Sequence, residues 1–377
     1  VYERCLCNYT VSTRLVFSYK VRNLWRNVWN GFDLWIDQYF ILDLLSKIFK
    51  INIIMREESS LKSFLRFGVY CYNMLRGYYW QFMAKHFPAV NAKEEMKRQK
   101  QTELIREADI RNPIYFNEKM LWLKYHLYNK SDIVAMCYNK YMVREYVENK
   151  GLAHILNKLY FVSERIEDIP WSGLPEECVI KLSNGYYGHV FKRKDAPFDI
   201  EKAKKILRNT KRRCSFAFRI SGDLFVYGTK PVYVCEKLIK AKKSGALPDD
   251  YKIHCFHGVP RFLEYIHDRN YENKSNFFES AFIDIANMVD RSDLEGEASP
   301  IDKIVLPSSF DEMLECAKKL SADFPYVRVD FYEENGHPVF GELTFTPYHL
   351  QTKTSLKELG VLIHLEYIEK YKRILIS

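Results

Sequence analysis

The chain has 377 residues, of which 47% are hydrophobic and 28% are charged. This composition is typical of a globular protein with a large buried core, and it excludes an intrinsically disordered chain. The net charge of +9 favours anionic partners such as phosphates, acidic glycans or lipid headgroups, whereas the 48 acidic residues argue against a purely electrostatic nucleic-acid binder.

The first hundred residues are apolar and aromatic but are interrupted by charges. In "LWRNVWNGFDLWIDQYFILDLLSKIFK", residues 24–50, Asp33, Asp37, Asp43 and Lys47 occur before about 18 consecutive apolar residues accumulate, so this stretch is not expected to span a membrane. It also lacks the pattern of a removable signal peptide. Residues 1–54 are therefore expected to be an N-terminal extension, because the character of the chain changes at Met55.

Residues 55–106 are predicted to form a basic, aromatic helical segment. Leu61, Phe64, Leu65 and Val69 recur at helical spacing among lysines and arginines. One interpretation is a helix lying in a membrane interface with its cations towards the headgroups. The alternative is a helix packed on the protein's own core. The expected location is cytoplasmic, with peripheral contact at the inner face of the cell membrane under the first interpretation.

From residue 107 onward, helices and strands are interspersed, and the antiparallel arrangement of the strands predicts an α+β fold. Helices are expected over residues 117–129, 139–151, 198–213, 308–324 and 355–375. Strands are expected over residues 159–165, 178–183, 187–194, 224–228, 232–239, 251–258 and 260–269, followed by a hairpin near residue 335.

The stretch "RVDFYEENGHPVFGEL", residues 328–343, is predicted to be a hairpin with a carboxylate on each arm. Asn335 and Gly336 are a strong turn signal, and alternation puts Arg328 and Asp330 on one face. If Glu342 shares that face, the two carboxylates could hold a Mg²⁺ ion that also contacts nucleotide phosphates, with Arg328 donating to an anionic phosphate. The alternative is a solvent-exposed salt bridge of little energetic value.

A second candidate site lies in "CVIKLSNGYYGHV". Lys181 ends an apolar strand and precedes a loop that contains Asn184, Gly185 and Gly188. A lysine and loop amides in this arrangement can bind phosphate. The alternative is a surface lysine before an ordinary β-turn.

Other polar residues carry weaker signals. The apolar strand over residues 232–239 ends with groups whose backbone could contact an adenine edge. The nine cysteines include no C-x-x-C pair and indicate buried thiols in a reducing compartment. Three histidines in alternating β segments are expected to be structural or exposed rather than metal ligands: His254, His257 and His267.

Taken in order, these motifs resemble the ATP-grasp superfamily and, more narrowly, the TupA-like ATP-grasp proteins, which are named for teichuronopeptide synthesis and found with cell-surface polysaccharide genes. The resemblance rests on "NPIYFNEKMLWLKYHLYN", "NKYMVREYV", "DDYKIHCFHGVPRF", "FPYVRVDFYEENG" and "FGELTFTP", and it spans residues 107–370. It implies two α+β lobes that clasp a nucleotide, preceded by an N-terminal helical region. Residues 107–175 would begin the ATP-grasp region, 176–240 would form the small lobe, and 241–377 would form the large lobe with the metal hairpin and a C-terminal helix.

The resemblance also implies roles for individual residues. Lys140, on the helix expected over residues 139–151, and Lys181 match the two nucleotide-phosphate lysines, and Asp250 falls where the superfamily often has a ribose-binding acid. Asp330 and Glu342 match the Mg²⁺ ligands. The catalytic residues implied are Lys181 and Arg328, the latter steadying the transferred phosphoryl group. The remaining nucleotide-binding positions are the loop residues Asn184, Gly185 and Gly188 and the adenine hinge Glu236, Lys237, Leu238 and Ile239.

The implied activity is that of an ATP-dependent carboxylate–amine ligase with ATP and Mg²⁺, which activates a carboxylate as an acyl-phosphate and joins it to an amine. Its partners would be an acidic cell-surface glycan or lipid-linked precursor and an amino acid or amine, with no nucleic acid. The sequence departs from the family at Thr344, where many ATP-grasp ligases have Asn, in the "YHLQTKTS" stretch, and in the loop with Tyr186 and Tyr187. The alternatives are a nucleotide- or glycan-binding protein on this scaffold that has lost turnover, and a glycosyltransferase of polysaccharide assembly.

Overall fold

The computed structural model describes residues 58–98, 106–240, 247–267, 279–294, 306–347 and 353–376. The chain divides into two compact units, residues 1–69 and 70–377. The described part of the first unit is the beginning of α3 (Glu58–His86), and the extension expected over residues 1–54 lies outside the described residues. The second unit carries the features described below.

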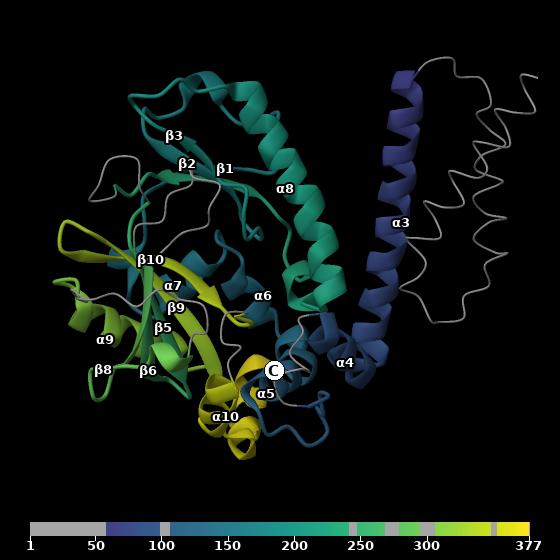
Figure 1. The fold of residues 1–377 in the computed structure, drawn as a ribbon. Helices are drawn as coiled ribbons and strands as arrows, with labels where there is room; N and C mark the ends of the chain where they lie inside the picture. Colours follow the sequence, from purple (N-terminus) through teal and green to yellow (C-terminus); the bar gives the residue numbers. More distant parts are fainter. Residues whose placement is uncertain are drawn as a thin grey trace, which may run out of the picture. The chain divides into compact units, whose positions relative to one another are not determined.

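The second unit combines helices with two antiparallel sheets, which confirms the α+β prediction (Figure 1). Its strands are β1 (Leu159–Ser163), β2 (Cys178–Leu182), β3 (Val190–Lys192), β4 (Tyr233–Lys237), β5 (Asp250–Phe256), β6 (Val259–His267), β7 (Glu279–Asp284), β8 (Val289–Asp290), β9 (Tyr326–Glu334) and β10 (His337–Thr344). Its α-helices after α3 are α4 (Pro88–Arg98), α5 (Phe116–His126), α6 (Asp132–Tyr138), α7 (Val143–Asn149), α8 (Ile200–Ser221), α9 (Phe310–Ser321), α10 (Lys353–Val361) and α11 (Ile368–Leu375). Short 3₁₀ helices are η2 (Tyr128–Lys130), η3 (Ala153–Ile155), η4 (Trp171–Gly173), η5 (Leu224–Tyr227), η6 (Ser292–Leu294) and η7 (Leu365–Tyr367).

The smaller sheet has the strand order β1-β4-β2-β3 and is packed against α8. Asp199 caps the N-terminus of α8 by accepting a hydrogen bond from the Lys202 amide, and Gly222 caps the C-terminus in the left-handed conformation with φ 76°. Ile180 of β2 is buried in one cluster with Leu207 of α8. Because side chains alternate along a strand, the neighbours of Ile180 in β2 point to the opposite face of the sheet.

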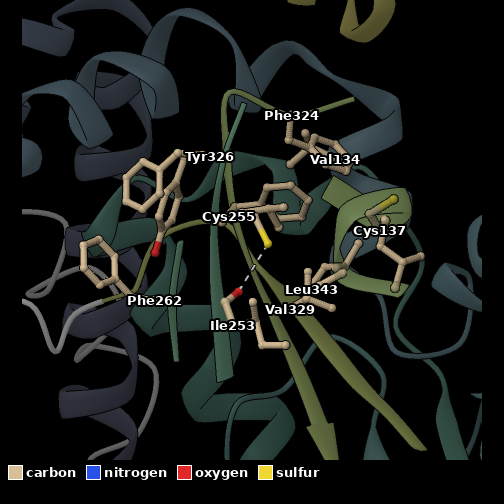
Figure 2. Close-up of a cluster of buried hydrophobic side chains, with 14 of the residues drawn as sticks. Val134, Cys137, Ile253, Cys255, Phe262, Phe324, Tyr326, Val329 and Leu343 are labelled. Atoms are coloured by element: carbon tan, nitrogen blue, oxygen red, sulfur yellow. Dashed lines mark hydrogen bonds between the residues drawn. The ribbon is translucent and has the colours of Figure 1, made fainter. Parts of the chain in front are cut away.

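The larger sheet has the strand order β10-β9-β5-β6-β7-β8. Ile253, Val329 and Leu343 stand at one register on β5, β9 and β10 and form a row on one face. Figure 2 shows this row packed with Val134 and Cys137 of α6. The apolar face of the sheet is thus covered, which leaves the opposite face to carry polar side chains.

Two sequence predictions near the large sheet were wrong. Residues 224–228 do not form a strand but the 3₁₀ helix η5, because the Leu224 and Phe225 amides donate to the Asn129 side chain (2.8 and 3.2 Å) instead of to a strand. The helix expected over residues 139–151 begins only at Val143, so Lys140 lies in a turn and not on a helix.

The single helix expected over residues 355–375 is broken into α10, η7 and α11. Near the end of α10, Gly360 lies so close to the chain before α5 that a Cβ there would be 2.8 Å from the Ile114 carbonyl oxygen. Beyond it, the His364 amide donates to Nε2 of His257, 2.9 Å away. Tertiary contacts therefore turn the chain where local periodicity would continue a helix.

The part of α3 within the second unit is amphipathic. Ala84 and Trp80 are buried, and Ala84 belongs to a cluster with residues of α4 and α5, as expected for a helix packed on the protein's own core. Tyr78 and Phe82 are each 53% exposed on the other side. No helix in the described parts of the chain is long and apolar enough to cross a membrane.

Candidate active site

Four charged side chains form a row across the polar face of the large sheet. Glu342 pairs with Asp330, Asp330 with Lys252, and Lys252 with Glu264, on β10, β9, β5 and β6 respectively. Directly paired residues of antiparallel strands project to the same face of a sheet. The row therefore lies opposite the apolar row of Ile253 and its neighbours.

A β-bulge at Gly341 brings Glu342 into this row. The pairing of β9 with β10 is regular as far as Phe340 opposite Phe331, and it then shifts so that Glu342 lies opposite Asp330. Without the extra residue, Gly341 would face Asp330 and Glu342 would point to the apolar side. A Cβ on Gly341 would lie 2.9 Å from the Asp330 carbonyl oxygen, so only glycine fits here without a backbone shift.

Arg328 and Asp330 form a buried, bidentate ion pair. Nε and Nη2 of Arg328 donate to the two Asp330 carboxylate oxygens, each at 2.7 Å, and Lys252 Nζ donates to Oδ2 at 3.1 Å. Arg328 is 5% exposed and Asp330 is 3% exposed, so the alternative of a solvent-exposed salt bridge was wrong. Burial would lower the pKa of Arg328, but Asp330 and Glu264 raise it, and the guanidinium stays charged.

Arg328 also contacts Glu264, which in turn contacts His254. Glu264 Oε2 accepts from Arg328 Nη1 at 3.5 Å and lies 3.2 Å from His254 Nε2, while His254 Nδ1 lies 2.8 Å from the Tyr326 hydroxyl. Burial lowers the pKa of His254, which is therefore neutral. Burial would raise the pKa of Glu264, but Arg328 and the His254 hydrogen bond hold it below its ordinary value. With Glu264 ionised, His254 donates from Nε2, and its role is structural as expected.

Lys140 joins the glycine loop to the β9–β10 hairpin. Its Nζ donates to the Gly185 carbonyl at 2.8 Å and pairs with Glu342 Oε2 at 2.9 Å, and its amide donates to the Ser183 carbonyl at 2.8 Å. Burial would raise the pKa of Glu342, but Lys140 and Lys252 hold it below its ordinary value. The ammonium of Lys140 thus already lies beside one of the predicted metal ligands.

Lys181 occupies the polar face of the small sheet. Its Nζ donates to Glu236 Oε2 at 3.0 Å, and Arg144 Nη1 lies 3.6 Å from the other oxygen of the same carboxylate. The Lys181 side chain is 19% exposed, so it is not the freely solvated lysine of the β-turn alternative. In the loop that follows, Gly188 has φ 71°, and a Cβ there would collide with the Thr210 side chain of α8.

A cavity of about 220 Å³ lies between the polar faces of the two sheets. It brings together most of the predicted residues: Lys140, Lys181, Lys237, Leu238, Ile239, Asp250, Asp330 and Glu342. The other predicted residues do not line this cavity. Arg328 lies behind Asp330, and Glu236 contacts Lys181, which does line it. Gly185 and Gly188 are adjacent in sequence to the lining residues Tyr186 and His189, whereas Asn184 lines a different cavity. The nucleotide roles of these residues remain predictions.

Two residues of the charged row, Lys252 and Glu264, were not predicted from the sequence. Lys252 lies in the cavity beside Asp330 and also 3.8 Å from Asp250. A usable signal was present, because Asp250, Lys252 and His254 place a polar residue at every second position of an otherwise apolar strand. The same alternation had marked Arg328 and Asp330.

The carboxylates of Asp330 and Glu342 fit a Mg²⁺ ion that is bound partly by the protein and partly by nucleotide phosphates. Within the described residues, no three His, Cys, Asp or Glu side chains come together in a way that could hold a metal ion. Asp330 and Glu342 supply two hard oxygen donors from opposite strand positions, and Mg²⁺ commonly takes one or two carboxylates and completes its shell with phosphate oxygens and water. The cysteines offer no competing site, since those in the described ranges are free thiols and all but Cys71 are buried.

The chain is similar in sequence to one protein family and, over part of its length, to several solved structures. The sequence model of the TupA-like ATP-grasp family matches residues 118–363. The structure of D-alanine–D-alanine ligase from Helicobacter pylori is 14% identical over 66% of this chain and 68% of that one, with a TM-score of 0.36. VanG D-Ala:D-Ser ligase from Enterococcus faecalis is 14% identical over 63% and 62%, with a TM-score of 0.37. The ATP-grasp ligase PsnB, solved with a phosphomimetic variant of its minimal precursor, Mg and ADP, is 13% identical over 64% and 60%, with a TM-score of 0.34.

No curated protein sequence matches the chain. The family match covers well over half of the residues and includes the four lysines of the cavity and the whole β9–β10 hairpin. The order of motifs and the two-sheet architecture both agree with it. The chain therefore belongs to the TupA-like ATP-grasp family.

Proposed function

We propose that the protein is an ATP-dependent carboxylate–amine ligase that works with Mg²⁺ and forms an acyl-phosphate. The observation that carries this proposal is the meeting of Asp330 and Glu342 with Lys140, Lys181 and Lys252 in one cavity. Two carboxylates and three ammonium groups suit a polyphosphate with its divalent cation. Family membership supports the same reaction class.

The residues of the chain divide the work by position. Lys140 and Lys181 bind phosphate oxygens, and Lys252 and Arg328 fix Asp330 and offset the charge that develops on the transferred phosphoryl group. Mg²⁺, when bound to Asp330 and Glu342, supplies further charge neutralisation at the phosphates.

The proposed ligation has two steps. A substrate carboxylate oxygen attacks the γ-phosphorus of ATP and ADP leaves, which gives the acyl-phosphate. The amine nitrogen then attacks the acyl carbon, phosphate leaves with the bonding electron pair, and the amine loses a proton. The cavity lies between two sheets, an arrangement that favours exclusion of water from the acyl-phosphate.

The proposed acceptor is an acidic cell-surface glycan or its lipid-linked precursor, and the donor is an amino acid or amine. The net charge of +9 supports an acidic substrate. A lipid-linked precursor implies work in the cytoplasm at the inner face of the cell membrane, and the exposed Tyr78 and Phe82 of α3 suit peripheral contact with headgroups.

A second candidate is a nucleotide-binding protein without turnover. The ion pair between Lys140 and Glu342 favours it, because a phosphate and a metal ion must both compete with this contact. The bulky Tyr186, which lines the cavity from the loop, points in the same direction.

The test measures ADP and phosphate release with ATP, Mg²⁺, uronic-acid-containing oligosaccharides and a mixture of amino acids. We expect release that requires both co-substrates and that falls by about 100-fold or more in Asp330→Asn and in Glu342→Gln, since each change removes a charged metal ligand. The matched control is Asp284→Asn, which removes another buried carboxylate, paired with Arg261 at 3.3 Å outside the cavity.

The control should keep its activity. ATP binding without turnover in any mixture would favour the second candidate, and absence of ATP binding would contradict both.

A further inference from the structure

A second cavity, of about 440 Å³, lies between α8, the loop after β2 and the segment after η5. We call it the α8 cavity and define it by Asn184, Lys211, Ser215, Phe218, Arg219 and Tyr227. It shares no lining residue with the cavity that contains Asp330 and Glu342, which is called the nucleotide cavity from here on. Apart from Asn184, which the family resemblance placed in the phosphate loop, its residues have no role in the binding of the nucleotide, the metal or the amine proposed above.

The α8 cavity is cationic. Lys211, Arg219 and Lys230 line it, and no Asp or Glu is among its described lining residues. Lys230 pairs with Glu164 at the surface. Within the described residues, the side-chain contacts of Lys211 and Arg219 are with aromatic rings and neutral polar groups, and none is with a carboxylate. An anion that enters the cavity would therefore meet positive charge that no carboxylate already neutralises.

Arg219 is fixed in place by neutral groups. Its Nη1 donates to the Ser215 carbonyl and hydroxyl oxygens, each at 2.7 Å, and its Nε donates to Gln81 Oε1 at 3.1 Å. The guanidinium also lies 4.9 Å from the centre of the Tyr227 ring. These contacts orient the cation without removing its charge, which is the arrangement of a preorganised anion site.

Asn184 adds a polar group that calls for a partner. The residue is 8% exposed, and its Oδ1 is buried without a hydrogen-bond partner. Buried carboxamides are rarely left unsatisfied, and a hydroxyl group in the cavity would supply the missing donor after a small adjustment of the side chain. Phe218 and Leu182 provide apolar surface beside it. The positive charge matches a carboxylate, the Asn184 oxygen matches a hydroxyl group that donates to it, and the aromatic ring matches the apolar side of a sugar. Together these features match a sugar that carries a carboxylate.

The two cavities are close neighbours. The ring of Tyr186, which lines the nucleotide cavity, lies 5.5 Å from the ring of Phe218 in the α8 cavity. In addition, Asn139 Nδ2 donates to Thr229 Oγ1 of the α8 cavity at 2.9 Å, and Asn139 immediately precedes Lys140. A chain of sugars bound in the α8 cavity would adjoin the site of phosphoryl transfer.

We propose that the α8 cavity binds a uronic acid unit and serves as a subsite for the acidic glycan. This inference rests on the proposed function for the identity of the glycan, and on the α8 cavity itself for the chemistry of the bound unit. Lys211 and Arg219 bind the carboxylate, Asn184 accepts from a hydroxyl group, and Phe218 contacts the apolar side of the ring.

Saturation-transfer NMR on the full chain without nucleotide tests the binding directly, with D-glucuronate as the probe. We expect a signal from D-glucuronate, none from D-glucose, and displacement of glucuronate only by a large excess of inorganic phosphate. Lys211→Gln should weaken glucuronate binding by about tenfold, because it removes a charge that meets the carboxylate. The matched control is Lys202→Gln, an exposed lysine of the same helix that does not line the cavity.

Three results would overturn the inference: no glucuronate signal, equal weakening by both variants, or displacement by phosphate at equal concentration, which indicates a plain anion site. The ligase assay separates this inference from the proposed function. If turnover with the glycan is intact and Lys211→Gln leaves the KM for the glycan unchanged, the subsite is wrong and the ligase stands. If glucuronate binds in a Lys211-dependent way without any turnover, the sugar site stands and the ligase does not.

Discussion

At the scale of single residues, Arg328 is held by two carboxylates at once. Asp330 binds two of its nitrogens at 2.7 Å, and Glu264 lies 3.5 Å from a third. A buried guanidinium that loses one of two anionic partners is left partly uncompensated, which costs more than the hydrogen bond itself. Glu264 therefore positions Arg328 without lining the nucleotide cavity.

We predict that Glu264→Gln lowers kcat by about tenfold and changes the KM for ATP little, because it loosens Arg328 while it leaves the cavity lysines in place. Steady-state ADP release measures both constants. Asp284→Asn again serves as the control for loss of a buried carboxylate beside an arginine. An equal loss in both variants would indicate general destabilisation and contradict a positioning role.

At the scale of elements, the bulge in β10 decides whether Glu342 shares a face of the sheet with Asp330. Asn335 and Gly336 have φ values of 55° and 79°, so the predicted turn does form between β9 and β10. The turn alone would put Glu342 on the wrong face, and the extra residue at Gly341 corrects this. The turn was readable from the sequence, whereas nothing in the alternation of the strand indicated the bulge.

We predict that Gly341→Ala lowers ADP release by about tenfold or more and destabilises the fold by about 1–3 kcal/mol, because the new Cβ must push against the Asp330 backbone. Activity assays and urea unfolding measure the two effects. Gly173→Ala is the matched control, since a Cβ there would meet nothing within 4 Å. Full activity in Gly341→Ala would show that the bulge tolerates a side chain and that Glu342 is not placed by it.

At the scale of the whole molecule, His257 ties the turn between β5 and β6 to the C-terminal helices. Its Nδ1 lies 3.0 Å from the Tyr371 hydroxyl, and its Nε2 accepts from the His364 amide at 2.9 Å. Burial is the main cause that lowers the pKa of His257 from 6.5 to about 4, and the nearby His364, Lys370 and Lys119 contribute to this shift against the opposing effect of Glu366. Protonation would also turn the Nε2 acceptor into a donor that faces another donor.

We predict that the free energy of unfolding falls as the pH drops from about 6.5 to about 4. Because the pKa of His257 is lower in the folded state, the unfolded chain binds the proton more readily. The stabilisation is therefore complete above the ordinary pKa and is lost as the pH falls to the pKa of the folded state. The loss is at most about 3 kcal/mol for this group. Urea unfolding at several pH values measures this slope. It should be flatter in His257→Gln, which cannot be protonated, and unchanged in His154→Gln, an exposed histidine. An unchanged slope in His257→Gln would contradict the prediction.

The sequence by itself determined the class of fold, the order of the motifs and eight of the residues that line the nucleotide cavity. Turn chemistry, strand alternation and a lysine before a glycine loop are local signals, and Asp330, Lys140 and Lys181 followed from them or from the family resemblance. Family membership followed from several such signals in one order.

Only the tertiary structure decided the rest, because it depends on contacts between residues far apart in the chain. The bulge at Gly341, the break before α11 and the turn that carries Lys140 all depend on such contacts. Strand pairing set Lys252 beside Asp330 and Glu264 beside Lys252, and the packing of α8 placed Asn184 in a second cavity. Local periodicity records which face a residue prefers, but the register between strands and the packing of helices decide what that face meets.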